Sequence, residues 1–445
     1  MSPRRPVTGQ ILAAALAATL LGAGACGTQA AGNPGTPAGA IATAPATAPG
    51  GTAAPGSGAG TTAPLPGMPP PLAPHDLYAA DRPGALSPAV QADVHRVYVP
   101  NHASNSVSVI DPATGTVIQT VPVPVGPEHV VPSWDLRTLW VNSDTGNALT
   151  PINPANGAFG RPVRVDDPYN LYFTPDGRYV VVMAERLHEL VFRDAHTMAV
   201  HKVVPVDCAG VNHADFSPDG RYFIVSCEFS GDLLKVDTAR QQVIAQQRLP
   251  APHPMPQDVK ISPDGSTWYV ADMQTSGLWL LNGDTFGRPR FLPTGAGAHG
   301  LYVSRDSRHL YVTNRGEGTI SVLDFATNRI AAKWRIPGGG SPDMGGLSPD
   351  GRLLWLSGRY HGEVYAIDTT TGRLAYRIPV GAAPHGLCVW PQPGRYSLGH
   401  AGILRWPPAP GLQMDPVRGR GGGCGAAEPG QAQQLLDRGQ GRAVR

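Results

Sequence analysis

A unit of about 43 residues recurs along this chain, and this repeat limits the possible folds more than any other feature of the sequence. Each copy has an aspartate followed five residues later by an apolar, often aromatic residue. The intervals between successive aspartates are 42, 41, 43, 45, 42 and 44 residues. A unit of this length has room for four short strands with their turns, so seven copies predict the seven blades of a β-propeller. The pairs are Asp93/Tyr98, Asp135/Trp140, Asp176/Val181, Asp219/Ile224, Asp264/Tyr269, Asp306/Tyr311 and Asp350/Trp355.

The residues inside each unit favour strands over helices. In the sixth unit, Leu310-Tyr311-Val312 is a continuous apolar run, and a turn containing Gly318 separates it from the alternating run Ile320-Ser321-Val322. Alternation with a period of two and glycine-containing turns are typical of antiparallel strands. Helical repeats share this length, but they need apolar residues spaced at 3.6, which these segments lack. We therefore predict an all-β fold, a seven-bladed β-propeller of four-stranded antiparallel blades.

The first unit lacks its innermost strand. Its first segment, residues 96–101, corresponds to the second strand of the other units, whereas Gly386 to Trp390 has the pattern of an innermost strand at the far end of the repeats. We expect these two segments to pair, so that the C-terminal strand closes the ring. The predicted propeller covers residues 95–404, after a lead-in at 75–94.

Short motifs within the repeats resemble those of a known family. Tyr311-Val312-Thr313-Asn314 matches the signature of YVTN-repeat propellers, and Pro384-His385-Gly386-Leu387 matches the same pattern, as does Ser-Pro-Asp-Gly at 217, 262 and 348. The chain thus resembles the YncE-like propellers over roughly residues 95–400. Relatives of that group include the haem-binding propeller of nitrite reductases and the propeller lactonases. The resemblance therefore implies the fold and leaves the activity open.

The first 25 residues are typical of an export signal. Arg4 and Arg5 precede an apolar run from Ile11 to Leu21, which is too short to favour a membrane-spanning helix. The small residues 23–25 before Cys26 resemble a lipobox, in which the Cys26 thiol is acylated. Cleavage without lipidation is the alternative, because Ala23 stands where leucine is preferred. We expect an exported lipoprotein anchored to the cell membrane, or else a secreted protein.

Two segments outside the repeats predict disorder. From Gly27 to Pro74 there is no Asp, Glu, Lys or Arg, so residues 26–74 are expected to form a flexible tether. Residues 405–445, rich in Gly, Arg and Pro, are expected to form a disordered tail. The formal charge of +2, with 15% charged residues, indicates no nucleic-acid surface.

Polar side chains recur where the innermost strands begin, six and seven residues before each aspartate. Because these strands surround the central channel, the side chains should form a ring at one mouth of it. Capping of the backbone is the alternative role for any single member. The ring comprises Glu128-His129, Tyr169-Asn170, Asn212-His213, Gln257-Asp258, His299-Gly300, Asp343-Met344 and His385-Gly386.

Two groups near this mouth have metal-binding residue types. The first is an arc for a metal or an anionic ligand, formed by Glu128, His129, His299, Asp343, Met344 and His385. The second suits a soft ion such as copper or zinc, and consists of Cys208, His213, Cys227, His253, Met255 and Met273. A disulfide between Cys208 and Cys227, worth about 3 kcal/mol, or packed free thiols are the alternatives. Cys388 lies within a strand and is expected in the core.

Turn residues and absent motifs complete the sequence-based prediction. Charged residues on the turns between second and third strands should frame a polar pocket at the same mouth, namely His102, Glu185, Glu228, Arg315 and Arg359.

The absence of Cys-x-x-Cys-His excludes a covalent c-type haem. No Gly-x-Ser-x-Gly, phosphate loop or His-Glu-x-x-His occurs, and the Gly295 to Gly300 glycine pattern leads into a strand, unlike a dinucleotide site.

We therefore predict a binding module without assigned catalytic residues, whose mouth takes a metal, a small ligand or a protein partner. The alternative is a metal-dependent enzyme, either a lactonase-like hydrolase or a redox protein, in which Asp258, Asp343 or Glu128 acts with ring histidines. The expected ligand contacts are His129, Asn170, His213, Asp258, His299, Asp343, Met344, His385, Arg315 and Arg359.

Overall fold

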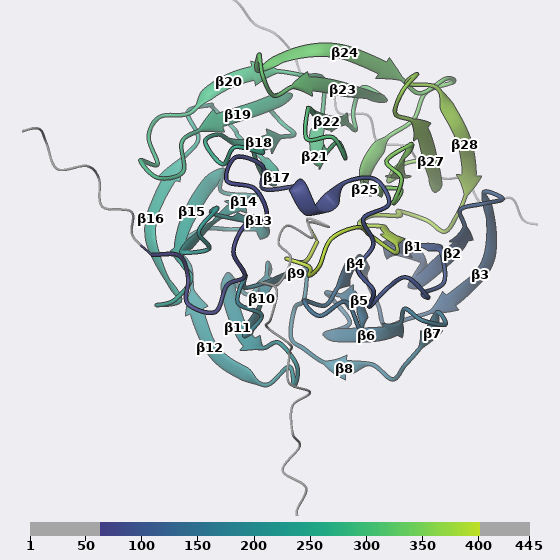
Figure 1. The fold of residues 1–445 in the computed structure, drawn as a ribbon, viewed down its shortest axis with the longest axis horizontal. Coiled ribbons are helices and arrows are strands. Elements are labelled where there is room, and N and C mark those ends of the chain that lie inside the picture. Colours follow the sequence, from purple (N-terminus) through teal and green to yellow (C-terminus); the bar gives the residue numbers. More distant parts are fainter. Residues whose placement is uncertain (1–62, 401–445) are drawn as a thin grey trace, which may run out of the picture. The chain divides into compact units, whose positions relative to one another are not determined.

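A computed structural model of the protein describes residues 63–400, which form seven antiparallel sheets around a central channel (Figure 1). Six sheets have four strands, and the second has five because its outer position is shared by two short strands. The predicted all-β seven-bladed propeller is confirmed. The only helices among these residues are two 3-10 turns, η1 (Ala79–Asp81) and η2 (His102–Ser104).

We number the blades in chain order. Blade 1 contains β1 (Arg96–Asn101), β2 (Ser106–Asp111), β3 (Thr116–Pro122) and β29 (Cys388–Trp390). Blade 2 contains β4 (Pro127–Pro132), β5 (Leu139–Ser143), β6 (Ala148–Asn153), β7 (Ala158–Phe159) and β8 (Val163–Arg164). Blade 3 contains β9 (Asn170–Phe173), β10 (Tyr179–Ala184), β11 (Glu189–Asp194) and β12 (Val200–Pro205). Blade 4 contains β13 (Val211–Phe216), β14 (Tyr222–Cys227), β15 (Asp232–Asp237) and β16 (Gln242–Arg248).

In the last three blades, the strands follow chain order from the channel outward. Blade 5 contains β17 (Pro256–Ile261), β18 (Trp268–Asp272), β19 (Gly277–Leu281) and β20 (Arg290–Pro293). Blade 6 contains β21 (Ala298–Val303), β22 (His309–Asn314), β23 (Thr319–Asp324) and β24 (Arg329–Arg335). Blade 7 contains β25 (Pro342–Leu347), β26 (Leu353–Gly358), β27 (Glu363–Asp368) and β28 (Leu374–Pro379).

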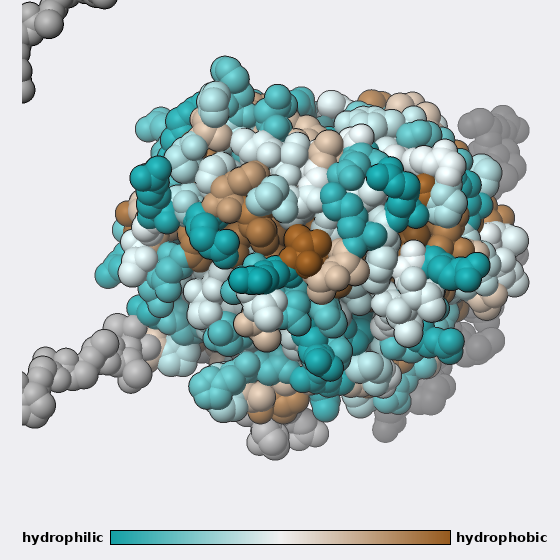
Figure 2. All heavy atoms as spheres, turned by 90° about the horizontal axis from the view of Figure 1, so that it is seen from above, coloured by the Kyte–Doolittle hydropathy of each residue, from teal (hydrophilic) through white to brown (hydrophobic). Residues whose placement is uncertain are grey.

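Burial decreases from the second strand to the outermost strand of a blade. In blade 6, five of the six residues of β22 are buried, because both faces of the sheet pack against neighbouring blades. The outermost β24 instead alternates exposed and half-buried residues. Seen from the side, the rim carries mostly hydrophilic residues with small apolar groups (Figure 2). Three of the exposed apolar side chains, Ile118, Val200 and Ile244, lie on outermost strands.

The repeated aspartate forms the turn between the first two strands of a blade. In blade 5, Asp264 Oδ1 accepts hydrogen bonds from Ser262 Oγ at 2.5 Å and from the Ser266 amide at 3.0 Å. Gly265 follows with a φ of 76°, a left-handed conformation that favours glycine. The aspartates of blades 2, 3, 4, 6 and 7 make the equivalent bond to a serine or threonine hydroxyl. The repeat therefore marks this turn, because it needs a short acceptor side chain.

The ring closes as expected. β29 pairs with β1 in antiparallel register, with Val389 opposite Val97. The first aspartate of the repeat has a different role there, since Asp93 Oδ2 accepts a hydrogen bond from Trp390 Nε1 at 2.8 Å. The C-terminal strand is thus tied both to the sheet and to the lead-in.

Both flanking segments cover the end of the channel that lies opposite the candidate mouth. The lead-in bonds to successive blades, with the Leu65 amide donating to Asp219 O, Leu77 to Pro263 O and Gly84 to Pro349 O. Leu65 is buried, so residues 63–74, which we assigned to the tether, belong to the folded part. In Figure 1 the lead-in, with its helical turn η1, crosses the channel opening.

The C-terminal segment after β29 enters the channel from this closed end, which the sequence did not predict. The Phe173 amide donates to Leu398 O at 3.1 Å and the His400 amide to Leu171 O at 3.2 Å. An isolated antiparallel bridge joins Tyr172 to Gly399. The segment therefore adds to the free inner edge of β9 and delivers His400 into the channel.

The predicted signal at 1–25, the lipidation site Cys26 and the predicted tail at 405–445 lie outside the described residues. Within residues 63–400, no helix has the length and apolar character needed to cross a membrane.

Candidate functional site

The open mouth of the channel is a cavity of about 310 Å³. Its walls combine side chains from the starts of the innermost strands with side chains from the turns between second and third strands, as the repeat predicts. Because all seven blades contribute to these walls, residues far apart in sequence become neighbours. The cavity is lined by Glu128, Tyr169, Glu185, Glu228, Phe229, Gln257, His299, Arg315, Arg359, Tyr360 and His385.

Glu128 at the start of β4 is surrounded by positive or hydrogen-bonding groups. Arg359 Nη1 donates to Glu128 Oε2 at 2.9 Å and Nη2 to Oε1 at 3.4 Å. His385 Nδ1 lies 2.7 Å from Oε2, and His102 Nδ1 lies 2.7 Å from Oε1. Burial alone would raise the pKa of Glu128, but His385, Arg359 and His102 together hold it well below its usual range. Glu128 is therefore a buried carboxylate that stays ionised.

Asp343 at the start of β25 forms the second charged centre. Arg315 Nη1 donates to Asp343 Oδ1 at 3.1 Å, and His299 Nδ1 lies 3.1 Å from the same oxygen. The other oxygen, Oδ2, has no hydrogen-bond partner although Asp343 is fully buried, and His385 Nε2 lies 3.7 Å from it. The Met344 sulfur lies 3.1 Å from His299 Nδ1. His385 thus connects the Glu128 and Asp343 centres.

These contacts gather one possible metal site. Ligand atoms of His299, Asp343 and His385 all lie within 4.8 Å of one another, and this is the only such group of histidine, cysteine or acidic residues in residues 63–400. Burial and the nearby Arg315 charge hold the pKa of His299 well below its usual range, so its imidazole is neutral and has a lone pair for a metal. The donors are imidazole nitrogen and carboxylate oxygen, with a thioether beside them.

Three further histidines pack below this group, inside the channel. The His129 ring lies 4.1 Å from the His400 ring and 5.5 Å from the His213 ring, measured between centroids. Burial, with the neighbouring His400, His385 and His213 rings, holds the pKa of His129 well below its usual range. A Cβ atom on Gly386 would collide with the His129 ring, so the glycine after His385 makes room for this packing. The three imidazoles are therefore neutral and fill the channel by packing against one another.

Acidic residues occupy the other side of the mouth. Glu185 follows β10 and Glu228 follows β14, and neither forms an ion pair within the described part of the chain. Burial, together with the charges of Glu228 and Glu128, raises the pKa of Glu185 to about 9. Burial also raises the pKa of Glu228, whose Oε2 accepts a hydrogen bond from Asn212 Nδ2 at 2.9 Å.

Two predicted ligand residues serve the backbone instead. Asn170 Oδ1 accepts a hydrogen bond from the Leu171 amide at 2.9 Å. Asp258 accepts from the Val259 amide with one oxygen and from the Leu301 amide with the other, both at 2.9 Å. Burial raises the pKa of Asp258 to about 6. Asp258 thus joins two neighbouring innermost strands, and Asn170 bonds within its own strand, so the capping alternative describes both better than a role as ligand or base.

The predicted soft-metal group does not assemble. Cys208 and Cys227 form a disulfide, which removes both thiolates from coordination. His213 points into the histidine cluster, whereas His253 is exposed at the surface. The Met273 sulfur lies 2.6 Å from Arg315 Nη2, and Met255 contributes its backbone carbonyl to Gln257. Of the open alternatives for the two cysteines, the structure contains the disulfide. Cys388 is buried, as expected.

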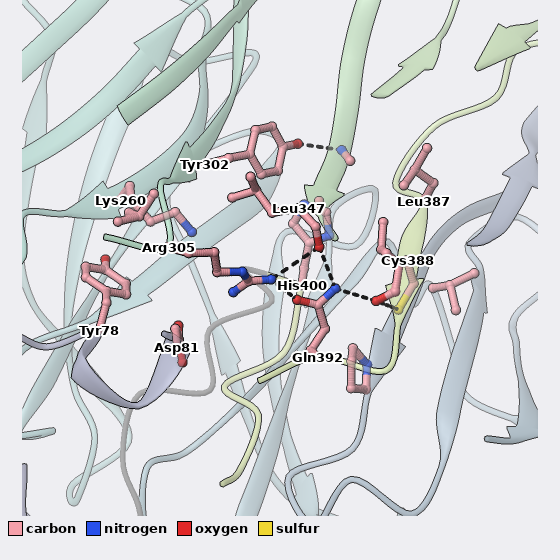
Figure 3. A pocket seen from close by; sticks show the side chains of 16 residues that line it. Tyr78, Asp81, Lys260, Tyr302, Arg305, Leu347, Leu387, Cys388, Gln392 and His400 are labelled. Atoms are coloured by element: carbon pink, nitrogen blue, oxygen red, sulfur yellow. Dashed lines mark hydrogen bonds between the residues drawn. The ribbon is translucent and has the colours of Figure 1, made fainter. Parts of the chain in front are cut away.

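A second, smaller cavity of about 60 Å³ lies between the channel and the segments that close it (Figure 3). Figure 3 shows Lys260 and Arg305 on one wall and His400 and Gln392 on the other. Arg305 Nη2 donates to Gln392 Oε1 and to Leu347 O, so the guanidinium ties the C-terminal segment to blade 7. This cavity is part of the closure rather than of the mouth.

His400 is the site residue that sequence reasoning missed. It lies beyond the last repeat, in a segment without a strand pattern, and its position depends on where the chain turns after Trp390. The other channel histidines were found because they share a position in the repeat.

The comparison with protein families supports the resemblance stated above. Residues 66–394 match the family described as YNCE-like beta-propeller. No curated protein matches the sequence.

Solved structures with a similar fold have diverse functions. A hydrazine synthase structure from Kuenenia stuttgartiensis shares 18% identity at a TM-score of 0.51, covering 73% of this chain and 99% of that chain. Dihydro-heme d1 dehydrogenase NirN shares 18% at 0.51, covering 72% and 79%. A putative 6-phosphogluconolactonase from Bacteroides uniformis shares 18% at 0.53, covering 66% and 99%. At these identities the likeness shows the fold alone.

Proposed function

This chain belongs to the YncE-like β-propeller family, a fold that carries many activities, and from its own mouth residues we propose that it is a binding module for a transition-metal ion. The ligands are His299, Asp343 and His385. Met344 stands beside them as a thioether donor. A set of nitrogen, oxygen and sulfur donors suits copper or zinc better than magnesium or calcium, which prefer oxygen alone.

The observation that carries this proposal is the proximity of three buried ligand atoms within 4.8 Å around a carboxylate oxygen without a partner. A buried carboxylate oxygen without a hydrogen bond is costly, and a bound cation would satisfy it. Arg315 contacts only Oδ1, which leaves Oδ2 for a metal.

The surroundings of His385 also support a metal site. A carboxylate beside the non-ligating nitrogen of a histidine orients the ring and strengthens the other nitrogen as a ligand. Glu128 occupies this place, because its Oε2 lies 2.7 Å from His385 Nδ1 while Nε2 faces Asp343. The mouth cavity, which both His299 and His385 line, provides the route of access.

An extracytoplasmic location is part of the proposal. It is supported by the export signal predicted at 1–25 and by the Cys208–Cys227 disulfide, since disulfides persist in oxidising compartments. Acylation of Cys26 would anchor the propeller to the membrane through the predicted tether.

Titration of the chelator-treated mature chain with Zn²⁺ and Cu²⁺ by calorimetry tests the proposal. We expect one site per chain, and at least about tenfold weaker binding for His385→Gln and for Asp343→Asn, because each removes a ligand. His196→Gln is the matched control, as His196 is exposed on a turn outside the mouth. Absence of saturable binding, or unchanged affinity in both variants, would overturn the proposal.

A further inference from the structure

The carboxyl groups of the mouth are not all paired with arginines. The guanidinium groups of Arg315 and Arg359 are each paired with a buried carboxylate, those of Asp343 and Glu128. Glu185 and Glu228 then form no ion pair among residues 63–400, although the Arg315 charge still acts on Glu228. Glu185 is only 9% exposed, and its Oε1 has no hydrogen-bond partner.

A third acceptor lies on the same side of the mouth, on a side chain that also interacts with Glu228. Gln257 is 1% exposed and lines the cavity. Its Nε2 donates to Met255 O at 3.3 Å, which fixes the orientation of the amide, and its Oε1 has no partner. A buried amide oxygen without a donor is costly, as is a buried carboxylate oxygen.

We propose that Glu185, Glu228 and Gln257 form a subsite for a primary alkylammonium group. An –NH₃⁺ group has three N–H donors and no acceptor, which matches one oxygen from each of these three side chains. The exposed ring of Phe229, directly after Glu228, offers an apolar surface to the attached alkyl chain.

A metal ion fits this side of the mouth less well than an ammonium group. In the described residues, neither Glu185 nor Glu228 belongs to a set of three His, Cys, Asp or Glu side chains with ligand atoms within 4.8 Å of one another. This side of the mouth therefore lacks the set of three imidazole and carboxylate ligands that occurs around Asp343. An ammonium group needs only acceptor oxygens, because all of its N–H groups donate hydrogen bonds.

The subsite gives binding a distinctive dependence on pH. The pKa of Glu185, raised by burial to about 9, keeps the free carboxyl protonated at pH 7. An ammonium group favours the ionised form, so binding at pH 7 releases a proton. An alkylamine stays charged up to a pKa of about 10.4. Affinity should therefore rise between pH 7 and pH 9.

This inference does not depend on the proposed metal site. The acidic subsite belongs to blades 3, 4 and 5, whereas the metal ligands come from blades 6, 7 and 1. A metal-free chain is expected to bind amines, so failure of one proposal is distinguishable from failure of the other.

The test is calorimetric titration of the metal-free mature chain with n-butylamine and with Nα-acetyl-lysine amide, in two buffers of different ionisation enthalpy. We expect saturable binding, with a heat that differs between buffers because a proton is released at pH 7. If only the lysine derivative binds, the ammonium group comes from a lysine side chain. Binding of both identifies small amines as sufficient.

Two variants and one control decide the role of the residues. Glu185→Gln should weaken butylamine binding at least about tenfold and abolish the proton release, because a charge-assisted hydrogen bond is lost. Gln257→Leu should also weaken it, and a retained melting transition shows that each variant is folded. Glu189→Gln, in the same hairpin but outside the cavity lining, should bind like the parent chain. No binding of either amine, or unchanged binding by the folded Glu185→Gln variant, would overturn the proposal.

Discussion

The two sides of the channel mouth differ in whether their buried carboxyl groups have ion-pair partners. On the side of blades 6, 7, 1 and 2, the buried carboxylates Asp343 and Glu128 are each bound by an arginine and approached by a histidine. On the side of blades 3, 4 and 5, Glu185 and Glu228 form no ion pair within the described residues. Burial shifts both pKa values upward, and the Arg315 charge only partly opposes this shift at Glu228. The repeat places similar polar positions on both sides, yet only on one side are the buried carboxylates paired with arginines.

This difference indicates which side is prepared for which ligand. A paired side is preorganised, because its ligand groups are held in place before anything binds. An unpaired acidic side has desolvated groups that only a ligand can satisfy. A metal on the first side and an ammonium group on the second is the arrangement that satisfies both, and the following changes test the contrast.

The largest effect is expected from breaking the paired side. Glu128→Ala leaves the half-buried Arg359 without its counter-charge, so the free energy of unfolding should fall by up to about 3–5 kcal/mol. Urea unfolding of the two chains measures this. Glu317→Ala removes a more exposed pair with Lys333 and should cost less than about 1 kcal/mol. Equal losses in the two variants would mean that the buried pair contributes no more than an exposed one.

A disulfide stabilises the side of the mouth on which the carboxyl groups form no ion pairs. Cys208 and Cys227 join two segments of the chain beside Glu228, 19 residues apart in sequence. Replacing both with serine should lower the free energy of unfolding by about 3 kcal/mol in the chain-entropy account. Reduction of the parent chain should reproduce this loss, whereas reduction of the double variant should change nothing.

The two sides should also respond to pH in opposite directions. The pKa of Glu128 lies below its unfolded value, so its contribution is present above pH 4.5 and is lost as the solution becomes more acidic. The pKa of Glu185 is raised to about 9, so its contribution is complete below pH 4.5 and is lost as pH rises toward 9. In thermal melts across this range, the stability of Glu185→Gln relative to the parent chain should increase as pH rises. The difference between their free energies of unfolding should grow by at most about 1.4 kcal/mol per pH unit. A constant difference between pH 5 and pH 9 would contradict the raised pKa.

Much of the fold could be predicted because each of its parts depends on local residues. The turn around Asp264 needs a short acceptor and a glycine, and the strand in Leu310-Tyr311-Val312 needs apolar residues on both faces. Copies of such local patterns at a constant interval then leave few ways to bury the apolar faces. The closing strand at 388–390 followed from the same count of strands.

The ring of mouth residues could be predicted as positions but not as contacts. His299, Asp343 and His385 share a place in the repeat, and the propeller geometry turns that place into a ring. Which ring members pair with each other, and which bond to the backbone as Asp258 does, depends on side-chain orientation across neighbouring blades.

The amino-acid sequence by itself determined the number of blades, the pairing that closes the ring and the identity of the polar residues at the mouth. Only the tertiary structure decided that Cys208 and Cys227 are joined, that His400 enters the channel from beyond the last repeat, and that Glu185 and Glu228 form no ion pair in the described residues. The physical reason is the range of the interactions involved. Turns and strands depend on residues close in sequence, whereas charge balance and burial depend on which distant side chains share one small volume.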